Sequence, residues 1–249
     1  MDINENNFAS KERFTEIIEA EFATVNQDMP PHTDPDLLAY RLEVATYLRD
    51  ALYALPIPDE LMETACNWTG IINQTYLYWT DEASRGTEVV DKLSLAFDCA
   101  KLWLGDVRAE YRCNLLYNRI GAEYEEFMAA AQLKRPLEII SDAWKIVCYD
   151  DVMMMFEHEE IPPKVVDALL TMESPLFAVY EELRDQDSSD HMNGILDAAQ
   201  DIADLQHESI LDGDIPIPEN PTLRPFFEEY LAAYGGGIEP ESDEAEIEP

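Results

Sequence analysis

The chain has 249 residues, of which 47% are apolar, so it can bury a sizeable core and is not a disordered acidic polymer. Its 53 acidic residues against 16 Lys and Arg give a formal net charge of −37, whereas a magnitude of about 2 to 8 keeps a small domain soluble. A field of this sign repels phosphates, so we expect no direct binding to nucleic acid or to an anionic membrane, and we expect a basic protein as partner.

The charge is unevenly distributed along the chain. Residues 1–145 hold 26 acidic and 13 basic residues, whereas residues 146–249 hold 27 acidic and 3 basic residues. The alternative explanations of the charge are a lineage-wide bias in composition and a high-salt habitat, and the latter predicts acidic residues spread over every exposed face. The asymmetry therefore favours a partner-directed role for the C-terminal part.

The cysteines and the hydropathy indicate the compartment. Cys66, Cys99, Cys113 and Cys148 have no CxxC spacing and lie in apolar helical patterns, which predicts buried free thiols in a reducing environment. No apolar run approaches about 18 residues and no leader pattern opens the chain. We expect a cytoplasmic protein without a membrane segment.

Nearly every segment has helical periodicity, and no run alternates as a strand would. We predict an all-α, bundle-like globular protein of about nine to eleven helices with a short disordered acidic tail. The expected helices are the following: Ser10 to Val25, Pro35 to Leu52, Pro58 to Trp79, Thr87 to Gly105, Asp106 to Ala131, Pro136 to Tyr149, a short one through Phe156 after a break at Asp150 and Asp151, one from Pro163, one from Pro175, Ser188 to Glu208, and Pro225 to Tyr234.

Local signals support several of these boundaries. Asp34 before Pro35 is a good N-cap followed by Pro at the first helical position. Gly105 is expected to end one helix, and Gly70 within another predicts a close helix approach. The run Met153 to Met155 is expected in the core, with an adaptable interaction surface as the alternative.

The middle of the chain resembles a small helical domain family of unknown function, found on conjugative elements and prophages of gut Clostridia. The residues that carry the resemblance are Leu116-Tyr117, Glu123-Tyr124, Pro136 to Ile140, Ala143, Asp150 to Met154, Phe156, Pro162, Ala168 to Leu170, Pro175-Leu176 and Tyr180. They are packing and turn residues, so the resemblance implies a genomic neighbourhood and no catalytic residue.

The resemblance covers about residues 113–205 and sets the predicted domains. These are an N-terminal helical region (1–112), a helical domain with an acidic face (113–208), a linker with an aromatic helix (209–234) and an acidic tail (235–249). One continuous helical domain is the alternative to a boundary near residue 112.

The segment from Ser188 to Glu208 carries the candidate site. At 100° per residue its acidic side chains fall within about 60° of arc, while Ile195, Ala198, Ala199, Ile202 and Leu205 are assigned to the packed side. The axial spacing of about 4.5 to 6 Å is comparable with the phosphate spacing of a nucleic-acid strand, although a solvated helix face is the simpler interpretation. The predicted partner-binding residues are Asp190, Asp197, Asp201, Asp204 and Glu208, with Glu181, Glu182, Asp185 and Asp187 beside them.

Catalytic and metal-binding motifs are not found in the sequence. His32, His158, His191 and His207 are far apart, and Asp204-x-x-His207 is one half of the pair of motifs that a di-metal site requires. No phosphate-binding loop or nucleophile motif occurs. We therefore expect no cofactor, no metal and no enzymatic activity.

Three hypotheses follow. The first is a DNA-mimicking inhibitor, carried by a phage or another mobile element, that occupies the basic cleft of a defence nuclease such as a CRISPR or restriction effector. The second is a helical adaptor that binds a partner through an apolar groove or through the helix from Phe226 to Tyr234. An enzyme is the third. The partner and the oligomeric state are not specified by the sequence.

Overall fold

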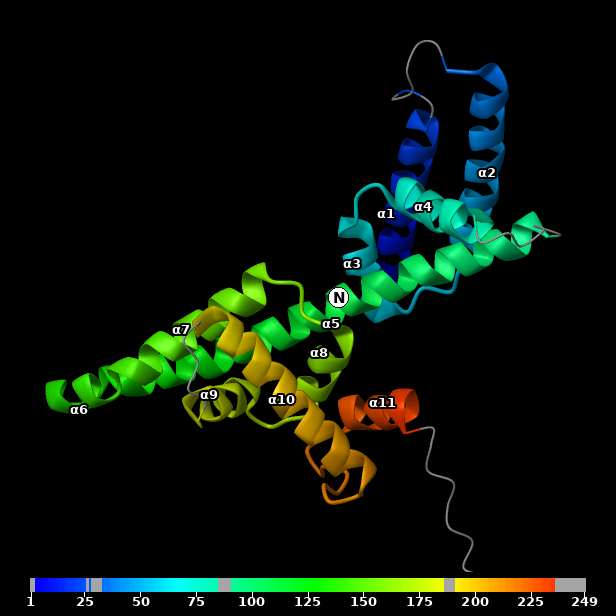
Figure 1. The fold of residues 1–249 in the computed structure, drawn as a ribbon. Helices are drawn as coiled ribbons and strands as arrows, with labels where there is room; N and C mark the ends of the chain where they lie inside the picture. Colours follow the sequence, from blue (N-terminus) through cyan, green and yellow to red (C-terminus); the bar gives the residue numbers. More distant parts are fainter. Residues whose placement is uncertain (1–2, 26, 28–32, 85–90, 186–190, 236–249) are drawn as a thin grey trace, which may run out of the picture. The chain divides into compact units, whose positions relative to one another are not determined.

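A computed structural model describes residues 3–25, 27, 33–84, 91–185 and 191–235. Within these residues it contains eleven α-helices, one short 3₁₀ helix and no strand, which confirms the all-α prediction and the expected number of helices (Figure 1). Helix α1 begins at Ile3 rather than near Ser10, because no Pro or Gly interrupts residues 3–9. The helices are α1 (Ile3–Thr24), α2 (Pro35–Ala54), η1 (Asp59–Leu61), α3 (Met62–Asn67), α4 (Ile71–Ser84), α5 (Lys92–Gln132), α6 (Pro136–Ser141), α7 (Ala143–His158), α8 (Pro163–Leu170), α9 (Pro175–Asp185), α10 (His191–Leu211) and α11 (Arg224–Tyr234).

The chain divides into two compact units, Met1–Tyr111 and Arg112–Pro249, which we call unit 1 and unit 2. Each unit has its own cluster of buried apolar side chains. Helix α5 contributes its residues up to Tyr111 to unit 1 and its residues from Arg112 to unit 2. The division falls one residue before the boundary that the resemblance suggested. The predicted tail, apart from Gly235, lies outside the described residues.

Helix α5 joins two segments that we expected as separate helices. Gly105 lies inside it and does not end it, so that prediction is wrong. A single Gly costs a helix only about 1 kcal/mol, and the buried side chains of Trp103 and Val107 continue the same packed face on both sides of it. The predicted start at Thr87 lies outside the described residues.

In unit 1 we expected one continuous helix from Pro58 to Trp79, but the structure interrupts it and a new helix, α4, begins at Ile71. Gly70 adopts a left-handed conformation with φ +73°, which breaks the helix there. Glu21 of α1 caps the new helix, because its carboxylate accepts the N–H groups of Gly70 at 2.7 Å and Ile72 at 2.9 Å. The predicted cap at Asp34 is confirmed, since its carboxylate accepts the N–H of Asp36 at 2.9 Å.

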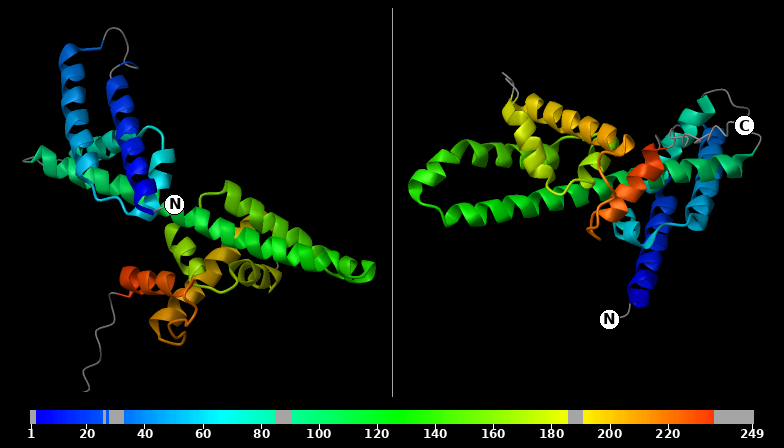
Figure 2. Two further views of the ribbon diagram at one scale, coloured as in Figure 1. Left: turned by 180° about the vertical axis from the view of Figure 1, so that it is seen from behind. Right: turned by 90° about the horizontal axis from the view of Figure 1, so that it is seen from below.

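Unit 2 is built on an antiparallel pair formed by α7 and the C-terminal part of α5 (Figures 1 and 2). Phe127 packs on Tyr149, with ring centroids 4.8 Å apart, and the methyl carbon of Met153 approaches Gly121. Short α6 lies in the connection between them, and the break falls at Asp142 rather than at the predicted Asp150 and Asp151. Helices α8 and α9 pack against α10 and complete the core.

Helix α11 belongs to the core of unit 2. Phe227 and Tyr230 are buried in it, and the helix packs against α8. The aromatic residues that we expected on a free docking helix are therefore largely occupied within the chain itself.

Candidate interaction surfaces

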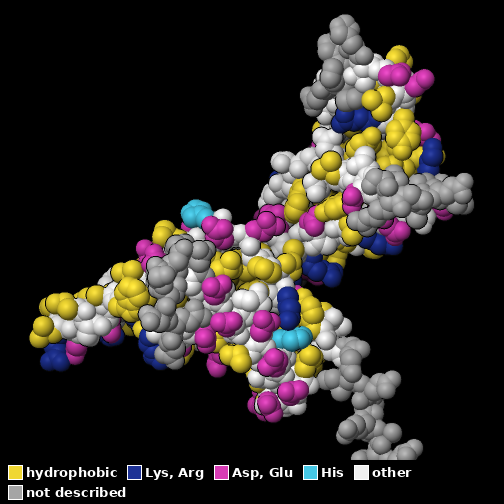
Figure 3. Space-filling view, viewed as in Figure 1, with side chains coloured by type: hydrophobic (Ala, Val, Ile, Leu, Met, Phe, Trp, Pro, Cys, Tyr) yellow, Lys and Arg dark blue, Asp and Glu magenta, His cyan; other side chains and the backbone are white. Residues whose placement is uncertain are grey.

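Helix α10 presents the predicted acidic stripe opposite a packed face (Figure 3). Ile195, Ala198 and Ala199 are buried as expected, and Ile202 is half-buried. Leu205 is 53% exposed, so its assignment to the packed side is wrong. The reason is geometric, because four residues advance a helix by about 40° and Leu205 therefore lies close to Asp201.

The described carboxylates of the stripe differ in their surroundings. Asp197, Asp201 and Glu208 are exposed. The Asp204 carboxylate instead accepts hydrogen bonds from the Gln200 amide at 3.0 Å and from the Lys164 ammonium at 3.1 Å. These two contacts lower the pKa of Asp204 below its ordinary value. The Asp204 carboxylate is thus already paired within unit 2.

The remaining predicted residues lie beside the stripe in sequence. Glu181 and Glu182 are half-buried on α9, and Glu181 forms an ion pair with Arg184 at 2.8 Å. Asp187 and Asp190, together with the side chain of Asp185, lie outside the described residues. The described part of the chain therefore places three exposed carboxylates on one face of α10.

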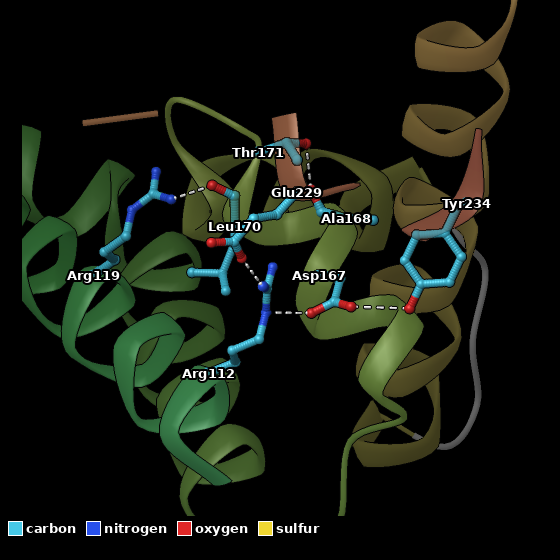
Figure 4. A network of polar contacts seen from close by, with 8 residues as sticks. All are labelled: Arg112, Arg119, Asp167, Ala168, Leu170, Thr171, Glu229 and Tyr234. Carbon is cyan, nitrogen blue, oxygen red and sulfur yellow. Dashed lines mark hydrogen bonds and ion pairs between the residues drawn. The ribbon is translucent and has the colours of Figure 1, made fainter. Parts of the chain in front are cut away.

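Two arginines of α5 hold unit 2 together (Figure 4). Arg112 pairs with Asp167 of α8 and Glu229 of α11, each at 2.5 Å. Arg119 instead donates to the carbonyl oxygens of Leu170, at 2.6 Å, and Met172. It thereby binds the end of α8, where carbonyl groups lack helical partners.

No candidate for nucleophilic or metal chemistry emerges from the described residues. Burial raises the pKa of the Cys99 and Cys148 thiols to about 11, which leaves them protonated and unreactive at neutral pH. No disulfide forms, and Cys113 is half-buried rather than buried. His207 lies 2.8 Å from the hydroxyl of Tyr230, and no cluster of three metal-ligating side chains occurs in this part of the chain.

A surface that the sequence analysis missed lies on α6 and α7. Figure 3 shows hydrophobic side chains gathered at the end of unit 2 that these helices form. Leu137 is 81% exposed and Trp144 is 58% exposed, although a folded chain normally buries such side chains. We call this surface the apolar stripe, and it consists of Leu133, which lies in the connection before α6, and of Leu137, Ile140, Trp144, Val147 and Met154 on the two helices.

On α7 the apolar stripe is a second apolar side of the helix. On α7, Cys148, Tyr149, Val152 and Met155 form the buried side, so the apolar residues at positions 144, 147 and 154 are a second apolar side. A helix that packs on a single side needs a single apolar face. A helix that is apolar on two sides and packs on only one of them therefore exposes an apolar surface.

None of the helices in the described residues combines the length and the apolar content needed to cross a bilayer.

The comparisons with known proteins concern unit 2. No curated protein and no solved structure matches the chain. The match to a family model begins at Arg112, the first residue of unit 2, and ends within α10, so it leaves α11 out. It confirms the predicted resemblance to an uncharacterised domain family: residues 112–206 match the model of a family described as a protein of unknown function (DUF3848).

Proposed function

We propose that the protein is a non-enzymatic binding module whose protein partner docks on the apolar stripe of α6 and α7. The observation that carries this proposal is the exposure of Leu137, Ile140 and Trp144, which follow one another at spacings of three and four residues. Contiguous exposed apolar patches on folded proteins commonly mark interaction sites. Trp is also among the residues that contribute most to binding energy when an interface covers them.

The spacing of the stripe fits a helical partner surface. Leu137 and Ile140 are three residues apart on α6, and Trp144 and Val147 are three residues apart on α7. An amphipathic segment of the partner with apolar residues at helical spacing would cover such a face. The partner contributes its own apolar side chains and removes this surface from water.

The charge indicates which kind of partner is favoured. With a net charge of −37, a second copy of the chain is repelled, whereas a basic protein is attracted over long range. We place this encounter in the cytoplasm, where buried thiols such as Cys66 and Cys148 stay reduced.

Comparative capture of partners with three forms of the protein tests the proposal. The forms are the native chain, the stripe variant Leu137→Gln/Trp144→Gln, and the acidic-face variant Asp197→Asn/Asp201→Asn/Glu208→Gln. All three should show the same helical circular dichroism, because every substituted side chain is exposed. A docking partner should be lost with the stripe variant, retained with the acidic-face variant, and retained at about 0.5 M salt, where the Debye length is only a few ångströms.

A partner that binds the stripe variant as tightly as the native chain would contradict docking on the apolar stripe. Each captured partner should also be purified, and its binding to the same three forms should be measured by calorimetry. This step separates direct contacts from indirect association.

A second candidate function is the DNA-mimicking inhibitor of a CRISPR or restriction nuclease, encoded by a mobile element of gut Clostridia. The exposure of Asp197, Asp201 and Glu208 on one face of α10 favours it. These carboxylates would pair with Lys and Arg side chains that normally hold phosphates. Binding to a purified nuclease should then exclude DNA, collapse with salt and be lost in the acidic-face variant, whereas the stripe variant should bind normally.

A further inference from the structure

The ammonium group of Lys145 lies inside a cage of four aromatic rings in unit 2. Its Nζ is 5.4 Å from the ring centroid of Phe127, 5.0 Å from that of Tyr149, and 4.9 Å from those of Phe177 and Tyr180. A cation within about 6 Å of a ring face is attracted to it, and aromatic cages of this kind recognise organic cations. The cage is formed by three helices, α5, α7 and α9.

Lys145 is not placed there by helix electrostatics. It lies in the first turn of α7, where the helix dipole disfavours a positive charge by about 0.3 to 1 kcal/mol. Within the described residues no carboxylate pairs with it. The aromatic rings are therefore its main favourable contacts, and the long side chain can leave them for water at modest cost.

An open pocket of about 250 Å³ adjoins the cage. Phe127, Tyr149 and Phe177 belong to both, and Glu123 and Glu126 add carboxylates to the pocket wall. Phe177 is 46% exposed, so a side chain arriving from solvent can reach the rings.

Glu123 indicates what the pocket is suited to hold. Its carboxylate accepts the backbone N–H groups of Leu176 and Phe177 at the start of α9, yet its Oε1 atom is buried and has no hydrogen-bond partner within the described chain. Leaving a buried acceptor unsatisfied costs about 1 to 3 kcal/mol. A donor bound in the pocket would remove that cost.

We infer that this pocket binds an arginine side chain of a protein partner, and that Lys145 occupies the aromatic cage until the partner arrives. A guanidinium group stacks on aromatic faces and offers five donors in a fixed plane, which suits rings and carboxylates together. Lys145 competes with the incoming cation and must leave the cage. The inference goes beyond the docking surface proposed above, since Lys145 and Trp144 lie on different sides of α7.

Nuclear magnetic resonance titration of the full chain tests the inference without any partner. The probe is N-acetyl-arginine amide, and the matched control probe is N-acetyl-citrulline amide, which has nearly the same shape and no charge. The arginine compound should shift the ring resonances of Phe127, Tyr149 and Phe177 in a saturable way, and the citrulline compound should not.

Two variants make the test specific. Lys145→Ala removes the internal competitor and should tighten binding of the arginine compound about two- to fivefold, the equivalent of one cation–π contact. Phe177→Ala should weaken it, and Lys101→Ala, an exposed lysine of unit 1, should change nothing. Equal shifts with both compounds, or weaker binding in Lys145→Ala with its fold intact, would overturn the inference. Because no partner is present, this result is independent of the fate of the apolar stripe.

Discussion

Arg112 and Asp167 form an ion pair that is largely removed from water, with Nε and Oδ1 2.5 Å apart and side chains 11% and 16% exposed. The pair joins α5 to α8. The other oxygen of Asp167 accepts a hydrogen bond from the Tyr234 hydroxyl at 2.9 Å, so α11 is attached to the same carboxylate. One acidic residue thus links three helices of unit 2.

Asp167→Ala should lower the free energy of unfolding by about 3 kcal/mol or more, because it leaves the Arg112 guanidinium buried without this partner. Urea denaturation followed by circular dichroism measures the effect. The control is Glu229→Gln, which removes the second carboxylate of Arg112. Since Glu229 is 64% exposed, that change should cost at most about 1 kcal/mol. Equal losses in the two variants would contradict the assignment of Asp167 as the central residue.

Glu123 should give unit 2 a pH-dependent stability. Burial is the main cause that raises its pKa above the ordinary 4.5, against the opposing N–H groups of Phe177 and Leu176. The folded state therefore keeps a proton that the unfolded state releases. The resulting stabilisation is complete below about pH 4.5 and is lost as the pH rises through the folded pKa.

The comparison of wild type with Glu123→Gln isolates this effect from the many other carboxylates. The unfolding free energy of wild type minus that of the variant should fall as the pH rises above about 4.5. Glu125→Gln, on an exposed position of the same helix, should run parallel to wild type. If the Glu123→Gln curve is also parallel to that of wild type, the pKa of Glu123 does not differ between the folded and unfolded states, and the prediction is wrong.

Much of the fold could be predicted because helix starts have local chemical signals. Asp34 with Pro35, and the prolines at positions 163 and 175, mark helix starts that the structure confirms. The glycines were misinterpreted, since Gly105 is tolerated within α5 whereas Gly70 breaks a helix. Tertiary contacts decide between these outcomes: Glu21 caps the new helix at Gly70, and that contact spans 49 residues of sequence.

The surfaces were harder to predict than the helices. Periodicity identifies an apolar face but does not say whether another element covers it, so it could not predict the exposure of Leu137 and Trp144. The reverse holds for α11, whose Phe227 and Tyr230 suggested a docking helix and are buried in the chain's own core. The Lys145 cage depends on rings from three helices and has no local signature at all.

Helix α11 should be required for the stability of unit 2, although the family match does not include it. Phe227 is 2% exposed, so Phe227→Ala should destabilise the protein by about 3 to 5 kcal/mol. Thermal unfolding measures this, with Phe226→Ala as a partly buried control that should cost less. An unchanged melting temperature would mean that the matched residues fold independently of α11. Deletion from Pro225 onward is therefore expected to perturb folding, and it cannot serve as a clean test of partner binding.

The acidic face of α10 should cost stability rather than provide it. Asp197 and Asp201 are four residues apart, and like charges at this spacing destabilise a helix by about 0.2 to 0.5 kcal/mol per pair. Asp197→Asn/Asp201→Asn/Glu208→Gln should therefore raise the unfolding free energy at low salt, and the gain should shrink as salt screens the repulsion.

Asp204→Asn should have the opposite effect, because Gln200 and Lys164 stabilise the charged form and lower the pKa of Asp204. The stability that this carboxylate contributes is present above its unfolded pKa and is lost as the pH falls through the folded value. Urea denaturation of both variants at low and high salt separates the two effects. If the triple variant is not more stable than wild type at low salt, the three carboxylates do not repel one another enough to matter. If it is more stable, the exposed acidic face reduces the stability of the isolated protein, and such a cost is expected where a surface serves binding.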